Sequence, residues 1–209
     1  QQENIMKTKK EVISVSQLVG TAILAALVLI LQLLAGSIRV GSFSITLTLV
    51  PIVIGAILYG PLSGALLGFL FGILVGISVA SGADAGGFLL FSLHPIITIL
   101  ICLCKSTLAG HLSGLVAEGL SKRNLPLGVF LAALTAPIVN TGLFLLGLTL
   151  FFRETLSQWA SGSQNLTSYI LFGLVGVNFL IELGVNIVLA PVIVRIVHAA
   201  HQMKNQEEI

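Results

Sequence analysis

Six long apolar stretches dominate this chain, and they follow one another with only short connections. Of the 209 residues, 56% are hydrophobic and 9% are charged, which leaves no segment polar enough to form a water-exposed domain. A helix needs about 20 apolar residues to cross the roughly 30 Å hydrocarbon layer of a bilayer. Because every backbone polar group must be bonded internally in lipid, we predict an all-α membrane protein, a single six-helix bundle over residues 1–209.

Charged and turn-forming residues mark the limits of these stretches. The predicted spans cover residues 15–35, 46–59, 61–80, 95–115, 126–152 and 167–197. The second span is short, and Gly60 and Pro61 follow it directly, which predicts a tight helical hairpin because proline is favoured in the first turn of a helix. The first apolar stretch is too long for the core of a cleavable signal peptide, so we expect it to remain as a helix.

Lysine and arginine are concentrated on one side of the predicted membrane. If the N-terminus is cytoplasmic, seven basic residues lie inside, two lie outside, and Lys105 lies within the fourth span. The inside set is Lys7, Lys9, Lys10, Lys122, Arg123, Arg195 and Lys204, and the outside set is Arg39 and Arg153. Because loops rich in lysine and arginine stay in the cytoplasm, we predict that both termini are cytoplasmic.

Small residues recur at every fourth position in two spans, which puts them on one helix face. A series that starts at Gly60, just before the third span, continues along it with Gly64, Gly68, Gly72 and Gly76. Such a glycine face lets another helix backbone approach closely, so we expect it to pack inside the bundle. The first span carries Ala22 and Ala26 at the same spacing, either for internal packing or for docking a second membrane protein.

Ionisable side chains inside the spans are the strongest functional signal, because an unpaired charge in the bilayer costs at least about 3 kcal/mol. Lys105 lies ten residues beyond Pro95, which is about 15 Å along the fourth helix. Glu182 lies in the sixth span, with Asn178 and Asn186 four residues to either side and on the same face. We expect this polar face to point into the bundle.

Two interpretations of these polar residues stay open. In the first, Lys105 and Glu182 pair with each other and lock the fourth and sixth helices together. In the second, a pocket among the fourth, fifth and sixth helices opens outwards, and Lys105 binds an anionic group of a ligand there. Asn140 and Thr141, in the fifth span, add an amide and a hydroxyl at a similar depth.

Two outer connections are placed to cover such a pocket. Residues 36–45 include Arg39 and alternate with a period of two, which predicts an extended segment. Residues 81–87 are rich in glycine and precede Phe88 and Phe91, which predicts a flexible loop that closes as a lid. An ordinary connector is the alternative for both. His94, next to the fourth span, either contacts a ligand or caps the helix.

Known catalytic motifs are absent from the sequence. No HExxH or GxSxG motif occurs and no aspartate lies in a span, so we expect no enzyme activity. Cys102 and Cys104 point in different directions on a helix, so neither a disulfide nor a metal site is expected. A stand-alone carrier with Glu182 as a proton site is an alternative, but it predicts an internal repeat, and none is convincing.

Residues 45–68, ITLTLVPIVIGAILYGPLSGALLG, resemble the signature region of the substrate-binding S components of energy-coupling factor (ECF) vitamin transporters. The six spans, the alanine pair and the polar face of the sixth span extend the resemblance over essentially the whole chain. It implies a vitamin-binding subunit of the prokaryotic plasma membrane that works with a transmembrane coupling protein and two ATPases. The absence of a GxxxxGK[ST] motif agrees that ATP is hydrolysed on partner chains, and no cofactor is expected in this one.

The resemblance implies that Ala22 and Ala26 face the coupling protein, and that the ligand lies in the outer halves of helices four to six. The predicted substrate-binding set is Lys105, Asn140, Thr141, Asn178, Glu182, Arg39 and His94. The pantothenate subgroup is the nearest, because a central lysine suits a carboxylate and few aromatic residues are placed to stack on a flat ring. Pyridoxine, hydroxymethylpyrimidine and riboflavin are alternative ligands.

Overall fold

The computed structural model describes residues 15–35, 39–40, 43–44, 47–121, 123–159 and 176–207. The helices are α1 (Val15–Ala35), α2 (Leu49–Tyr59), α3 (Pro61–Ala80), α4 (Ala85–Leu93), α5 (Pro95–Ser121), α6 (Leu125–Phe151), α7 (Arg153–Trp159) and α9 (Gly176–Glu207). Two short strands, β1 (Arg39–Val40) and β2 (Phe43–Ser44), pair in antiparallel register. The fold is therefore predominantly helical, and the extended segment expected within residues 36–45 is present as this strand pair.

Five of the described helices are long and apolar enough to cross a bilayer, namely α1, α3, α5, α6 and α9. The predicted second span is only the 11-residue helix α2, which reaches about 17 Å and is too short to cross by itself. Six full spans are thus not confirmed. Part of the predicted sixth span, residues 167–175, lies outside the described residues, and α9 continues beyond its predicted end to Glu207.

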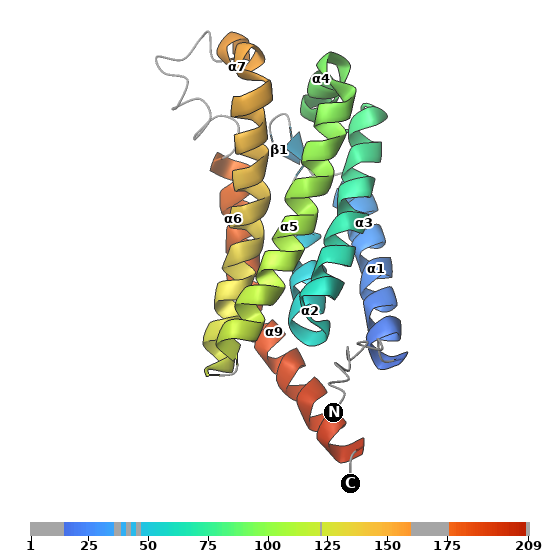
Figure 1. Cartoon of the computed structure of the whole chain (residues 1–209), viewed down its shortest axis with the longest axis vertical. Coiled ribbons are helices and arrows are strands. Elements are labelled where there is room, and N and C mark those ends of the chain that lie inside the picture. The colour runs from blue at the N-terminus through green and yellow to red at the C-terminus, as the bar shows by residue number, and fades with distance from the viewer. Residues whose placement is uncertain are drawn as a thin grey trace, which may run out of the picture.

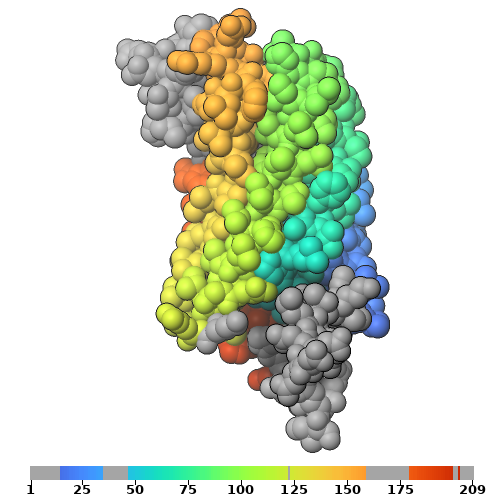
Figure 2. Space-filling model, viewed as in Figure 1, coloured from blue at the N-terminus to red at the C-terminus, as the bar shows by residue number. Residues whose placement is uncertain are grey.

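The long helices form one bundle, with the short helices α4 and α7 at the end where α5 begins and α6 ends (Figure 1). The α2–α3 turn, the start of α1 and the end of α9 all lie at the opposite end (Figure 1). Figure 2 shows α5 and α6 packed side by side along the bundle. The described chain thus begins and ends on the same side of the bundle, as the predicted topology requires.

The glycine face of α3 packs against the backbone of α5, as predicted. A Cβ atom added at Gly64 or at Gly68 would collide with the carbonyl oxygen of Gly110 or of Ser106, respectively. One added at Gly72 would lie 2.9 Å from the carbonyl oxygen of Cys102. Each step of four residues on α3 is matched by a step of four on α5 in the opposite direction. The two antiparallel helices therefore touch backbone to backbone, which only glycine permits.

Helix α2 begins inside the bundle, because Thr48 and Leu49 are both fully buried. A helix start normally leaves unpaired N–H groups, which are costly in lipid. Here the Val50 N–H donates to the Leu47 carbonyl oxygen at 3.3 Å, and Pro51 has no N–H to satisfy. The Thr48 hydroxyl donates to the Gln32 side chain on α1 at 3.4 Å. This arrangement lets a helix start at mid-depth.

The predicted flexible loop at residues 81–87 is wrong in its second half, because α4 begins at Ala85. The Asp84 side chain accepts a hydrogen bond from the Gly87 N–H at 3.2 Å and caps the helix. The turn before it uses Gly82 at a φ of 79°, a conformation that favours glycine. Residues 85–93, before the start of α5, are therefore a capped helix, which the glycine content of the sequence obscured.

Candidate functional site

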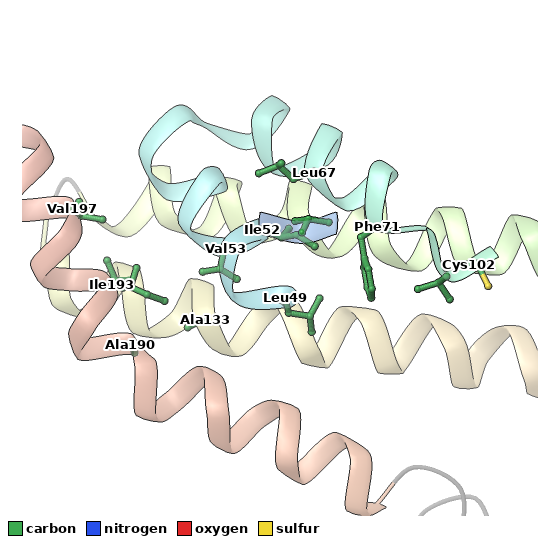
Figure 3. Packing of buried hydrophobic residues seen from close by; sticks show 14 of the residues in the cluster. Leu49, Ile52, Val53, Leu67, Phe71, Cys102, Ala133, Ala190, Ile193 and Val197 are labelled. Atoms are coloured by element: carbon green, nitrogen blue, oxygen red, sulfur yellow. The ribbon is translucent and has the colours of Figure 1, made fainter. Parts of the chain in front are cut away.

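Two separate apolar clusters stabilise the bundle. The main cluster is formed by Val28, Leu49, Ile52, Val53, Leu67, Phe71, Val75, Val79, Cys102, Val129, Ala133, Ala136, Ala190, Ile193 and Val197. Figure 3 shows how α2, α3, α6 and α9 contribute to it. The end cluster is formed by Leu90, Leu148, Phe152 and Leu156, with Phe144 and Phe179 packed against it. Residues of α6 belong to both clusters, while α9 contributes members to the main cluster and packs Phe179 against the end cluster.

Between the two clusters, the contact between α6 and α9 becomes polar. On α6 the main cluster ends at Ala136 and the end cluster begins at Phe144. On α9 the corresponding residues are Ala190 and Phe179. The buried polar residues inside these limits are Asn140 on α6 and Glu182 and Asn186 on α9, which are 5%, 6% and 1% exposed. We call these three residues the polar interval.

Lys105 lies at the same level on α5. Gly147 on α6 lies against the Ile101 side chain on α5, because a Cβ atom added at Gly147 would lie 2.6 Å from it. This close contact sets the register between α5 and α6. One turn further along, the Lys105 ammonium lies 5.1 Å from the centroid of the Phe144 ring. This distance is within the range of a cation–π interaction. The predicted pairing of Lys105 with Glu182 stays a prediction, while the contact with Phe144 was not foreseen.

Several buried oxygen atoms near this level have no hydrogen-bond partner among the described residues. They are Asn140 Oδ1, Asn186 Oδ1, Ser106 Oγ and Thr107 Oγ1. The Asn186 amide nitrogen, by contrast, donates to the Glu182 carbonyl oxygen at 2.8 Å. Most buried polar atoms in proteins are bonded, so the unbonded amide oxygens of Asn140 and Asn186 in the polar interval mark a candidate binding site.

The structure places the other predicted site residues as follows. Thr141 is half-buried on α6, beside Asn140. His94 is exposed and lies between α4 and α5. The centroids of the His94 and Phe152 rings are 5.6 Å apart, and the rings meet edge to face. Arg39 is in β1 and Asn178 is in α9, but their side chains lie outside the described part of the structure. The described part of the expected binding set is thus divided between the level of the polar interval and the end of the bundle that carries α4 and α7.

The end cluster lies between the polar interval and the end of the bundle that carries α4 and α7. It joins Leu90 of α4, Leu148 of α6, Leu156 of α7 and Phe152, which lies between α6 and α7. All four side chains are 2% exposed or less. Sequence reasoning assigned covering roles to loops, whereas the structure places two short helices there. The sequence signal that could have indicated α7 was the four-residue spacing of the apolar residues Phe152 and Leu156.

Ala22 and Ala26 lie on an exposed face of α1. The opposite face of this helix holds the fully buried Val28, and Thr21 donates to the Ser63 side chain on α3 at 3.3 Å. The alanine pair therefore does not serve internal packing, the first of its two interpretations. It presents a smooth surface to lipid or to another helix.

A family model described as "ECF transporter, substrate-specific component" matches residues 16–194. No curated protein and no solved structure matches the chain. The match covers α1 to α6 and most of the described part of α9, including every residue of the polar interval. Within the described residues, no group of three or more histidine, cysteine, aspartate or glutamate side chains is arranged to hold a metal ion.

Proposed function

Because the chain belongs to the family of ECF transporter substrate-specific components, we propose that it binds a carboxylate-bearing vitamin, most simply pantothenate, and delivers it through partner subunits. Membership makes it a multi-pass protein of the prokaryotic plasma membrane and a transport subunit with a small-molecule substrate. The proposal adds the identity of the substrate, the residues that bind it and the face that docks the coupling protein.

The observation that carries the proposal is the position of Lys105. Its ammonium lies over the Phe144 ring, at the level of the polar interval and beneath the end cluster. A cation–π contact contributes about 0.5 to 2 kcal/mol, whereas a close ion pair at low dielectric is stronger. A carboxylate that enters this site can therefore replace the ring as the partner of the lysine. Asn140, Thr141, Asn178 and Glu182 are the proposed neighbours of the remainder of the ligand, with Arg39 and His94 nearer the entrance.

The exposed face of α1 supports the second part of the proposal, the docking of the coupling protein. Ala22 and Ala26 allow a partner helix to approach closely, and the interior of the subunit does not use them. ATP hydrolysis is proposed to occur on two ATPase subunits bound to that partner.

Calorimetric titration of the purified subunit with pantothenate, pyridoxine and riboflavin tests the substrate. We expect pantothenate to bind most tightly of the three. Tight binding of uncharged riboflavin with no binding of pantothenate would overturn the carboxylate assignment. Purification from native membranes tests the partners, and recovery of the subunit with a membrane protein and two ATPases is the expected result.

A further inference from the structure

Two amide oxygens in the polar interval lack a hydrogen-bond partner, Asn140 Oδ1 and Asn186 Oδ1. Both residues are more than nine-tenths buried, since Asn140 is 5% exposed and Asn186 is 1% exposed. More than nine in ten buried polar groups in native proteins are bonded. Two unbonded acceptors at one level of the bundle therefore indicate that their donors come from a bound molecule.

The orientation of the Asn186 amide is set by the chain itself. Its nitrogen donates to the Glu182 carbonyl oxygen, one turn earlier on α9, at 2.8 Å. The other end of the same amide, Oδ1, therefore remains available for a donor from elsewhere. An amide oxygen accepts and cannot donate, so a second carboxylate or the edge of a hydrocarbon ring cannot satisfy it.

Asn140 occupies the matching position on α6. Ala136, four residues before it, belongs to the main cluster. Phe144, four residues after it, packs against the end cluster. The same clusters limit Asn186 on α9, through Ala190 and Phe179. The two amides therefore lie between the same two clusters, on two helices that pack together.

We infer that the substrate presents two hydrogen-bond donors, hydroxyl or amide N–H groups, to Asn140 Oδ1 and Asn186 Oδ1, in addition to the anionic group bound by Lys105. This inference rests on the proposed function and names the substrate class, a small hydroxylated or amide-containing acid. It also adds Asn186 to the binding residues, as a group that selects between substrates by the donors they carry.

The test combines variants of the protein with variants of the ligand. The ligands are pantothenate and two analogues that each lack one of its hydroxyl groups. The protein variants are Asn140→Leu and Asn186→Leu, which remove the acceptors at similar volume. Thr135→Val is the matched control, because Thr135 lies on α6 and its hydroxyl already donates to the Leu131 carbonyl oxygen at 2.7 Å. Calorimetry gives the affinity of each combination.

We expect each asparagine variant to weaken pantothenate binding about ten- to hundredfold, the loss typical of one buried hydrogen bond. In at least one variant, the removed asparagine oxygen is the acceptor of one pantothenate hydroxyl. The analogue that lacks this hydroxyl should bind to that variant as well as pantothenate does. Equal losses for all three ligands, or none, would overturn the inference. If a leucine variant does not purify as a monodisperse protein, the alanine variant takes its place.

Failure of the inference and failure of the proposed function give different results. If wild type binds pyridoxine but not pantothenate, and Asn140→Leu weakens pyridoxine binding, the proposed vitamin is wrong and the donor requirement is retained. If pantothenate binds and Lys105→Met weakens it, while neither asparagine variant changes affinity, the proposed function is retained and the donor requirement is overturned.

Discussion

The ammonium nitrogen of Lys105 lies 5.1 Å from the centroid of the Phe144 ring on the neighbouring helix. The face of an aromatic ring attracts the ammonium charge without forming a hydrogen bond. This cation–π interaction contributes about 0.5 to 2 kcal/mol. The contact therefore holds the lysine in place through a weak interaction. This state suits a residue that must exchange its partner for a ligand carboxylate.

Replacing Lys105 by methionine should weaken pantothenate binding by about 2 to 5 kcal/mol, because the ligand carboxylate is left without its buried partner. Lys105→Arg should not restore full affinity, since the guanidinium is larger and needs a different geometry. Calorimetry on the purified variants measures both effects. A neutral vitamin that binds tightly to wild type and to Lys105→Met alike would leave the lysine with a structural role only.

Enlarging the small face of α1 should abolish uptake and leave ligand binding nearly unchanged. Ala22→Leu together with Ala26→Leu prevents the close approach of a partner helix, while neither side chain is buried in the subunit. Uptake by whole cells and calorimetry on the isolated subunit measure the two functions separately. Leu27→Phe, which is exposed on a different face of α1, is the control and should transport normally. Parallel loss of binding and uptake would contradict the docking role.

Gly68→Ala should lower the stability of the bundle by about 1 to 3 kcal/mol, the usual range for overpacking. A Cβ atom at this position meets the Ser106 carbonyl oxygen, and backbone cannot move aside cheaply. Gly142→Ala on α6 is the matched control, because a Cβ there has nothing within 4 Å. It should leave the Tm unchanged or raise it slightly. Thermal unfolding in detergent compares the two, and equal Tm values would refute the close contact.

The ends of α6 provide a test of orientation. Arg153 and Arg123 are both exposed and lie at opposite ends of this helix, and the predicted topology places Arg153 outside and Arg123 in the cytoplasm. In a background with Cys102→Ala and Cys104→Ala, a membrane-impermeant thiol reagent should label Arg153→Cys in intact cells. Arg123→Cys should react only after permeabilisation. The reverse pattern would invert the topology and move the entrance of the site to the cytoplasmic side.

Helix limits were predicted well where the sequence itself supplies the stop signals. Val15–Ala35 and Pro61–Ala80 agree with the predicted spans at both ends. Proline begins the second of these, and turn residues follow it at Ser81 and Gly82. The packing face of α3 was also predictable, because a spacing of four residues fixes one helix face whatever it contacts. These features depend on local backbone geometry and on hydrophobicity.

Features that depend on which helices meet were not predictable. Composition alone indicated a loop where the Asp84 cap allows α4 to form, and it placed the start of the short second span three residues before the first residue of α2, Leu49. The sequence also identified Lys105 as a charge in need of a partner without identifying Phe144, which lies 39 residues away on another helix.

The sequence by itself thus determined that the chain is a helical membrane bundle and where most of its long helices lie. Hydrophobicity and the 3.6-residue period of the α-helix are sufficient for that. Only the tertiary structure decided the register between α5, α6 and α9, and with it the contact of Lys105 with Phe144 and the position of Asn140 and Asn186 between the two apolar clusters. That register depends on side-chain packing between segments far apart in the sequence, which no local pattern encodes.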